Sequence, residues 1–204
     1  MIIHDTIQGS TEWLQLRAGI PTASCFDMII TPQGRPSKQW ERYMHTLLAE
    51  RIMKRPVVEF VSTWMARGNQ MEAEAVAFYE SMRELDTDRI GFLTNDLGTI
   101  GASPDRFVGD EGLLEIKAPK EHVHIEYLLK KSVDSAYYPQ VQGQLWISGR
   151  KWLDILSYSP ELPPALIRVE RDEEYLAKLA VAVEEFSDEL ERLSADAVTK
   201  GWIR

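Results

Sequence analysis

The feature that most constrains the fold is a change of hydrophobic period near the middle of the chain. Residues 37–52 and 69–84 carry apolar side chains at three- and four-residue spacing, which predicts two helices with a core-facing stripe. The segments IGFLT (90–94), TIGASPDRFVG (99–109) and GLLEIKA (112–118) are short and separated by the turn sequences NDLG and GDEG. They predict an antiparallel meander of strands. Together, the two periods predict a mixed α/β domain.

The remaining segments complete this mixed order. Amphipathic stretches at 121–131 and 138–148 predict helices, whereas WLDILSYS (152–159) and ALIRVER (165–171) predict strands. Ser37, the last residue of the turn sequence TPQGRPS (31–37), is expected to cap the first long helix. A closing helix is predicted from an apolar stripe whose opposite face is crowded with Asp and Glu: Leu176, Leu179, Val183, Phe186, Leu190 and Leu193.

Length and composition limit the classes of protein that fit this pattern. A chain of 204 residues is long enough for one sizeable core and short for two, so we expect a single domain over 1–204. No apolar run approaches the roughly 20 residues that span a bilayer, and we therefore expect a cytoplasmic protein without membrane association. The one cysteine, Cys25, excludes an internal disulfide framework and a multi-cysteine zinc cluster.

The formal net charge of −9 argues against a nucleic-acid partner. Binding to a polyanion usually needs a basic surface that releases counterions. A chain of this charge that binds nucleic acid must gather its basic residues on one face. Its acidic residues must then occupy the outside and the catalytic centre.

The stretch GASPDRFVGDEGLLEIKAPK (101–120) contains the residues with the clearest chemical potential. Asp105 lies at the boundary of a predicted strand and a turn, and Glu115 and Lys117 follow within one predicted strand. Side chains alternate across a strand, so Glu115 and Lys117 point to the same face and Ile116 points into the core. The pattern thus aims a carboxylate and an ammonium group at one place.

A hairpin in this stretch would bring the carboxylates of Asp105 and Glu115 close together. Two such carboxylates repel one another unless a divalent cation lies between them, and hard oxygen ligands suit Mg²⁺ or Mn²⁺. The cation would lower the pKa of a bound water, and Lys117 would orient that water or stabilise developing charge, as phosphodiester hydrolysis requires. The alternative is an exposed hairpin with a Glu–Lys surface pair, because a D-x(n)-E-x-K pattern has loose spacing and common residues.

Residues 101–118 resemble the PD-(D/E)XK nucleases, and the whole chain resembles the phage lambda exonuclease and YqaJ-type viral recombinase family within them. The resemblance implies a restriction-endonuclease-like α/β core with a mixed central sheet flanked by helices. Five blocks that span most of the chain carry it: QGSTEWLQLRAGIPTAS (8–24), ARGNQMEAEA (66–75), GASPD (101–105), LEIKAP (114–119) and YYPQVQGQLW (137–146).

The resemblance implies roles for the residues of the acidic motif. Asp105 and Glu115 match the metal ligands of the family, and the main-chain carbonyl of Ile116 would complete the inner shell. Lys117 matches the catalytic lysine. Glu72 matches a helical glutamate that lies near the metals.

A second set of residues matches the family's pocket for the terminal 5′ phosphate of DNA: Arg17, Ser24, Ser103 and Gln140. This agrees with their chemistry, because a guanidinium binds phosphate in a bidentate way and hydroxyl and amide groups supply neutral donors. Met65 falls where the family inserts an apolar wedge between the terminal bases. The resemblance therefore predicts a DNA-end site as well as a metal site.

Each of these residues also has a purely structural interpretation. Arg17 can stabilise the C-terminal end of a short helix, and Ser24 can serve as an N-cap. Gln140 can be an ordinary surface residue and Glu72 a solvated helix residue. Met65 would more often belong to a core.

The resemblance further implies an enzyme that degrades one strand of double-stranded DNA from its 5′ end. It would release mononucleotides and leave a 3′ overhang, with Mg²⁺ as cofactor and Mn²⁺ as a substitute. A ring-shaped homotrimer, a single-strand annealing protein as partner in recombination, and a phage or prophage origin in a bacterial host are also implied. A ring would meet the charge objection, because its channel can be basic while its outside is acidic.

Two other functions remain open at this point. An endonuclease of restriction or repair type would use the same Asp105, Glu115 and Lys117 but would not need the end-binding residues. A non-catalytic DNA-end binding module would keep the fold and bind DNA without turnover. The intact acidic motif argues against the module, and cleavage of closed circular DNA would indicate the endonuclease.

Overall fold

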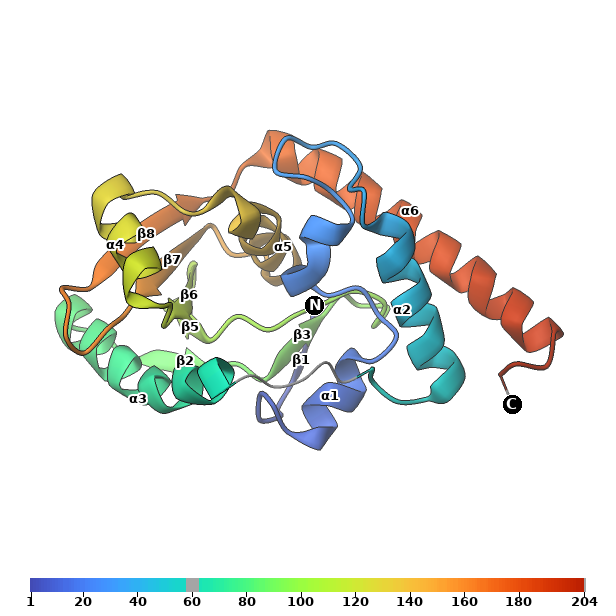
Figure 1. The fold of residues 1–204 in the computed structure, drawn as a ribbon, viewed down its shortest axis with the longest axis horizontal. Coiled ribbons are helices and arrows are strands. Elements are labelled where there is room, and N and C mark those ends of the chain that lie inside the picture. Colours follow the sequence, from blue (N-terminus) through green and yellow to red (C-terminus); the bar gives the residue numbers. More distant parts are fainter. Residues whose placement is uncertain (58–62, 204) are drawn as a thin grey trace.

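The structure is a computed structural model that describes residues 1–57 and 63–203, with the backbone alone described for 63–70. The larger of its two sheets has five strands (Figure 1). The strands lie in the order β2 (Thr87–Arg89), β5 (Arg106–Val108), β6 (Gly112–Lys117), β7 (Trp152–Ser157) and β8 (Ala165–Glu170). β6 and β7 run parallel, whereas the other neighbouring pairs are antiparallel. The predicted mixed sheet is confirmed.

The parallel pair requires a long crossover connection, because a tight turn can join only antiparallel strands. Two helices supply this crossover: α4 (Glu121–Lys130) and α5 (Tyr138–Ser148). Both agree with the predicted amphipathic stretches at 121–131 and 138–148. The crossover places α5 against the face of the sheet to which Leu113 of β6 points.

A second sheet has three strands in the order β1 (Ile2–His4), β3 (Phe92–Thr94) and β4 (Gly101–Ala102). The prediction of one meander over 90–118 is wrong, because β4 pairs with β3 in this sheet while β5 pairs with β6 in the other. Pro104 lies between β4 and β5. It has no N–H to donate to a ladder, so a continuous strand through this point is disfavoured.

Helices cover both faces of the five-stranded sheet, as predicted. Because side chains alternate across each strand, β6 and β7 contribute to two separate cores. Leu113 and Ile155 face one core, whereas Leu114 and Leu156 pack against Tyr79 on the opposite face. The first core lies under α2 (Trp40–Met53), α5 and α6 (Glu173–Thr199), and the second lies under α3 (Thr63–Arg83).

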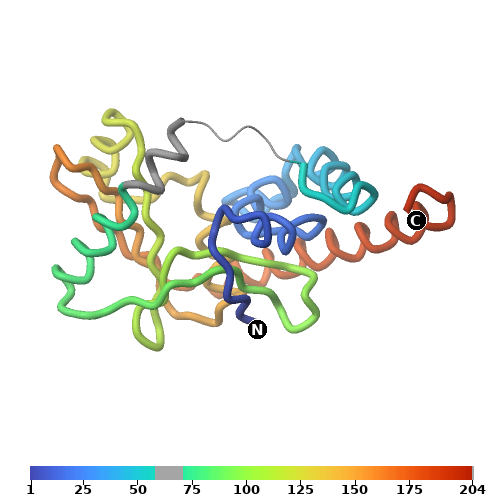
Figure 2. The backbone as a smooth tube through the Cα atoms, turned by 90° about the horizontal axis from the view of Figure 1, so that it is seen from below, coloured from blue at the N-terminus to red at the C-terminus, as the bar shows by residue number. Residues whose placement is uncertain are grey.

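Helix starts differ in detail from the sequence-based expectation. Ser37 does not cap α2, which begins at Trp40; its hydroxyl instead accepts a hydrogen bond from the Gln39 N–H in the preceding turn. α6 begins after Asp172, whose carboxylate accepts from the Tyr175 N–H at 3.0 Å. Figure 2 shows the last turns of α6 extending beyond the sheets. None of the helices in the described ranges is both long and apolar enough to cross a membrane.

A buried carboxylate ties α3 to the sheet. Asp154 of β7 is fully buried and accepts hydrogen bonds from Tyr79 Oη at 2.8 Å and Arg83 Nη2 at 3.0 Å. Arg168 adds two more, from Nε at 2.8 Å and Nη2 at 2.9 Å. A buried charge is tolerated only when it is paired in this way. The network fixes the C-terminal half of α3, and the helix carries Glu72 to the β5–β6 hairpin, where it pairs with Arg106.

Candidate active site

The β5–β6 hairpin brings Asp105 beside Glu115, as the sequence predicts. Arg106 pairs with Leu114 in the antiparallel register, so Asp105 stands at the open end of the hairpin. Its N–H donates to the Leu114 carbonyl at 3.2 Å, and its Oδ2 accepts from the Ile116 N–H at 2.6 Å. These two main-chain contacts hold the carboxylate against the strand that carries Glu115.

Glu115 and Lys117 share one face of β6, which confirms the prediction from strand alternation. Lys117 Nζ donates to Glu115 Oε1 at 2.8 Å and lies 4.6 Å from the centre of the Tyr137 ring. Ile116 points to the opposite face and packs with the core under α3. The strand therefore presents one carboxylate and one ammonium group side by side.

Two glutamines of α5 complete the surroundings of Glu115. Gln140 Nε2 donates to Glu115 Oε1 at 3.0 Å, and Gln144 Nε2 donates to Glu115 Oε2 at 2.8 Å. Residues four apart lie on the same face of a helix, so α5 aims both amides at one carboxylate. Sequence reasoning missed Gln144, although its spacing from Gln140 was the signal that could have revealed it.

The third glutamine, Gln142, makes its contacts away from Glu115 and anchors the helix. Its Nε2 donates to the Glu170 carbonyl at 2.9 Å, and its Oε1 accepts from the Asp172 N–H at 3.0 Å. Arg171 donates to the Leu145 carbonyl at 2.5 Å in the last turn of α5, and Glu173 holds its Nε at 2.9 Å. α5 is thus fixed to the connection between β8 and α6.

Negative charge accumulates around Asp105. Burial raises the pKa of Asp105 well above its ordinary value, and the nearby carboxylates of Glu115 and Glu72 raise it further. Glu72 is held by an ion pair from its Oε1 to Arg106 Nη2 at 3.1 Å. Burial lowers the pKa of Lys117, but the Glu115 carboxylate outweighs this effect and leaves the pKa above its ordinary value. The charges of two further carboxylates therefore act on Asp105, and Lys117 opposes them.

These donors fit a hard, hydrated divalent cation. Within the described ranges, no three His, Cys, Asp or Glu side chains are placed to hold a metal ion by themselves. Asp105, Glu115 and the Ile116 carbonyl would therefore share a cation with water, which is the usual coordination of Mg²⁺ in proteins. The mutual repulsion at Asp105 is the feature that a bound cation would relieve.

Arg17 forms a second cluster, with hydroxyl groups. Its Nη2 donates to Ser24 Oγ at 3.0 Å and to Thr22 Oγ1 at 3.3 Å, and its Nη1 donates to Ser103 Oγ at 3.4 Å. The guanidinium carbon lies 4.2 Å from the centre of the Trp13 ring. Among the residues with described side chains, no carboxylate pairs with Arg17. Burial lowers its pKa, yet a guanidinium stays charged at neutral pH.

The contacts of this cluster are those of an anion-binding site, not those of an arginine that stabilises the end of its own helix. Arg17 ends α1 (Thr11–Arg17), but its side chain reaches hydroxyl groups of other segments. The alternative that Ser24 is an N-cap is wrong, because Ser24 lies inside the 3₁₀ helix η1 (Ala23–Met28), whose N-cap is Thr22. Thr22 itself was not predicted as part of the cluster.

The Ser103–Asp105 segment joins the two clusters. Ser103 Oγ accepts from Trp13 Nε1 at 3.0 Å as well as from Arg17, and Asp105 follows two residues later. Within the described part of the chain, Gln140 makes no hydrogen bond to Arg17 or its hydroxyl partners, and its amide donates to Glu115 instead. The Met65 side chain lies outside the described residues.

Comparison with known proteins places this geometry in a family. Residues 12–151 match the model of the YqaJ-like viral recombinase domain, while no curated protein matches the chain. An alkaline exonuclease from Laribacter hongkongensis shares 30% identity at a TM-score of 0.85, covering 94% of this chain and 98% of its own. The structure of the same enzyme in complex with dAMP matches with a TM-score of 0.84, at the same identity and the same coverage of both chains.

A more distant structure shares the fold alone. The phage-related exonuclease from Haemophilus somnus is 15% identical, with a TM-score of 0.69, and the match covers 87% of this chain and 96% of that one. The family model covers most of the chain, including both blocks that position Asp105 and Glu115. The protein therefore belongs to the YqaJ-like viral recombinase family.

Proposed function

We propose that this protein is a Mg²⁺-dependent exonuclease that degrades one strand of double-stranded DNA in the 5′ to 3′ direction. It releases mononucleotides and leaves a 3′ overhang for recombination, and Mn²⁺ substitutes for Mg²⁺. The observation that carries this proposal is the joining of two clusters, Asp105–Glu115–Lys117 and Arg17–Ser24–Ser103, through one short segment. The exonuclease names of the similar structures support it.

Each residue of the acidic cluster has a distinct task in this proposal. Asp105, Glu115 and the Ile116 carbonyl would hold the cation, which would lower the pKa of a bound water and neutralise charge on the phosphoryl group. Lys117 orients the attacking water or stabilises the charge that develops on the phosphate. Glu72 approaches the same place from α3 and adds negative charge beside Asp105.

The Arg17 cluster recognises the terminal 5′ phosphate in this proposal. The guanidinium supplies two adjacent N–H donors and a fixed positive charge, and Ser24 and Ser103 supply hydroxyl donors. Gln140, predicted for the same pocket, contacts Glu115, so we assign it to the boundary between the phosphate and the metal cluster. Met65 remains the proposed wedge between the terminal bases.

Digestion of linear duplex labelled at either the 5′ or the 3′ end tests this function. With Mg²⁺ we expect label at the 5′ end to appear first as a mononucleotide, and a chelator to stop the reaction. Covalently closed circular duplex is the control and should survive. Cleavage of the circle would indicate an endonuclease, whereas binding without turnover in any divalent cation would indicate the end-binding module.

The Arg17→Ala variant tests the phosphate pocket. Charge-assisted hydrogen bonds contribute on the order of 1.5 to 3 kcal/mol, so initiation on a 5′-phosphorylated end should slow by roughly ten- to a hundredfold. Initiation on a 5′-hydroxyl end should slow much less, because such an end has no phosphate to accept hydrogen bonds from Arg17. Initial rates on both ends measure the preference. Arg192→Ala is a matched control, because this exposed arginine forms its ion pairs with Glu189 and Asp196 of the same helix, α6. An unchanged preference in folded Arg17→Ala would remove Arg17 from the pocket.

A homotrimer is proposed for the working assembly, together with a single-strand annealing protein as partner and a bacterial cytoplasm as the site of action. The net charge of −9 supports an assembly, because an acidic monomer would hold DNA poorly unless a shared channel gathered its basic residues. Light scattering should give three times the mass of one chain. A monomer at working concentrations would contradict the ring, and failure of a cognate annealing protein to co-purify would contradict the partnership.

A further inference from the structure

The carboxylate of Glu115 is held at both oxygens by donors of the protein. Lys117 and Gln140 donate to Oε1, and Gln144 donates to Oε2. Glu115 and Gln144 are both buried, and Gln144 is only 1% exposed. Gln144 therefore helps to orient a group that the proposed metal site requires, through a different oxygen from Lys117 and Gln140.

The other end of the same amide has an unusual environment. Gln144 Oε1 is buried and has no hydrogen-bond partner, and it is the single such side-chain atom found among the described residues. A buried acceptor without a donor is costly, and native proteins seldom keep one without a reason. Rotating the amide by half a turn does not remove the problem, because Oε1 would then face the Glu115 carboxylate, which has no proton to donate at neutral pH.

We propose that Gln144 is a positioning residue for the cation, fixing Glu115 through Nε2 and accepting a hydrogen bond through Oε1 from a water molecule bound to that cation. This inference rests on the proposed metal-dependent function. Mg²⁺ and Mn²⁺ keep several waters when bound to few protein ligands, and each such water offers O–H donors outward. A buried amide oxygen beside a metal-ligating carboxylate is suited to receive one.

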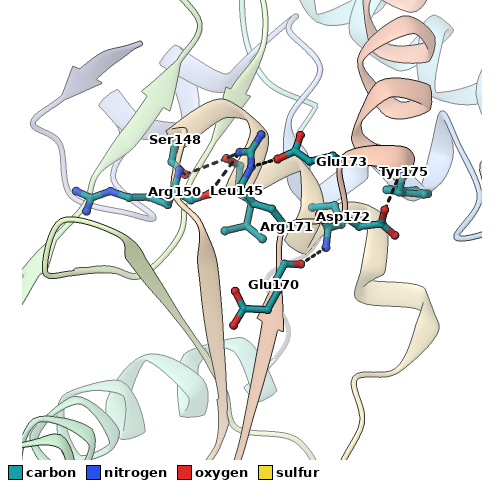
Figure 3. Close-up of polar contacts among 9 residues, drawn as sticks. Leu145, Ser148, Arg150, Glu170, Arg171, Asp172, Glu173 and Tyr175 are labelled. Carbon is teal, nitrogen blue, oxygen red and sulfur yellow. Dashed lines mark hydrogen bonds and ion pairs between the residues drawn. The ribbon is translucent and has the colours of Figure 1, made fainter.

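A purely structural role for Gln144 does not explain this arrangement. α5 is already anchored on its other side by three hydrogen bonds. Gln142 donates to the Glu170 carbonyl and accepts from the Asp172 N–H. Arg171 donates to the Leu145 carbonyl in the last turn of the helix (Figure 3). An apolar side chain at position 144 would fill the same space but would remove the donor to Glu115 Oε2. The amide is therefore better explained by what it does for Glu115.

Calorimetric titration of the full chain with Mn²⁺ tests the inference without a turnover measurement. Residues that orient metal ligands typically contribute tenfold to a hundredfold to metal affinity, so Gln144→Met should bind Mn²⁺ at least about tenfold more weakly than the wild type. Val141→Ala is the matched control: Val141 is buried on the same helix and has no polar contact with Glu115. It should lose stability but keep the wild-type Mn²⁺ affinity.

A second readout separates positioning from folding. Mn²⁺ should raise the melting temperature of the wild type more than that of Gln144→Met, and high Mn²⁺ should restore most of the variant's hydrolysis rate. If Gln144→Met fails to fold, Gln144→Asn keeps the amide but withdraws it from Glu115, and it should show the same weakened binding. Wild-type affinity in either folded variant overturns the role of Gln144 alone. Wild-type binding of Mn²⁺ that does not depend on Asp105 overturns the proposed metal site as well.

Discussion

Asp105→Asn is expected to abolish hydrolysis while duplex DNA still binds. A metal ion contributes several kcal/mol to the transition state, so loss of one ligand should lower the rate by on the order of a thousandfold or more. The amide oxygen of Asn can still accept from the Ile116 N–H, which Asp105 Oδ2 now contacts at 2.6 Å, so the hairpin should keep its shape. Single-turnover rates and filter binding on the same 5′-phosphorylated duplex measure the two quantities. Glu115→Gln should behave alike.

Stability separates this chemistry from a folding defect. The raised pKa of Asp105 means that this carboxyl destabilises the metal-free protein at high pH, and that the destabilisation decreases as pH falls from the raised pKa towards the ordinary one. The neutral amide removes the repulsion, so metal-free Asp105→Asn should unfold at the same or a higher denaturant concentration. Asp110→Asn, exposed in the turn of the same hairpin, is the control and should retain full activity. Near-normal turnover in Asp105→Asn would remove Asp105 from the metal site.

Local patterns in the sequence predicted the parts of the fold that depend on local physics. The helical stripes of α2, α5 and α6 follow from three- and four-residue spacing, because that spacing puts side chains on one face. Alternation along β6 placed Glu115 and Lys117 together, and the turn GDEG placed Asp105 opposite them. These relations involve residues within about one hairpin of each other.

Long-range pairing could not be read in the same way. β1 pairs with β3 across most of the N-terminal half, with Ile2 opposite Thr94, and no local pattern specifies such a partner. The break of the meander at Pro104 also depends on which sheet each flanking segment joins. His124 is fully buried between Ser157 Oγ at 2.7 Å and the Pro163 carbonyl at 2.9 Å, and both partners are more than 30 residues away in the sequence.

The candidate site shows the same division between local and distant contacts. Gln144 was missed because its partner, Glu115, lies on a strand that meets α5 only after the crossover is folded. Thr22 was missed because its hydroxyl meets Arg17 through a turn whose geometry the sequence does not reveal. Glu72 was found only through family resemblance. The structure gives it a physical basis, since its charge acts on Asp105.

Lys117→Met is expected to lose nearly all hydrolysis while keeping both metal and DNA. Preorganised donors that stabilise developing charge contribute on the order of a hundred- to a thousandfold to the rate. Methionine has an unbranched side chain of similar length but carries no charge. Lys117 donates to Glu115 Oε1, but Gln140 and Gln144 also hold that carboxylate, so the ligand should stay in place. Calorimetry with Mn²⁺ should therefore give near wild-type affinity. Loss of that affinity would make Lys117 a structural residue.

Lys117→Arg then distinguishes the two ways in which Lys117 can act. If its charge alone stabilises the phosphate, a guanidinium should recover part of the rate, because it is always protonated and binds phosphate well. If Lys117 orients the attacking water, the larger planar group should fail, because the space between the Glu115 carboxylate and the Tyr137 ring fits a compact ammonium, with contacts of 2.8 Å and 4.6 Å. We expect failure, with a rate close to that of Lys117→Met. Recovery of a substantial fraction of the wild-type rate would favour charge stabilisation over water orientation.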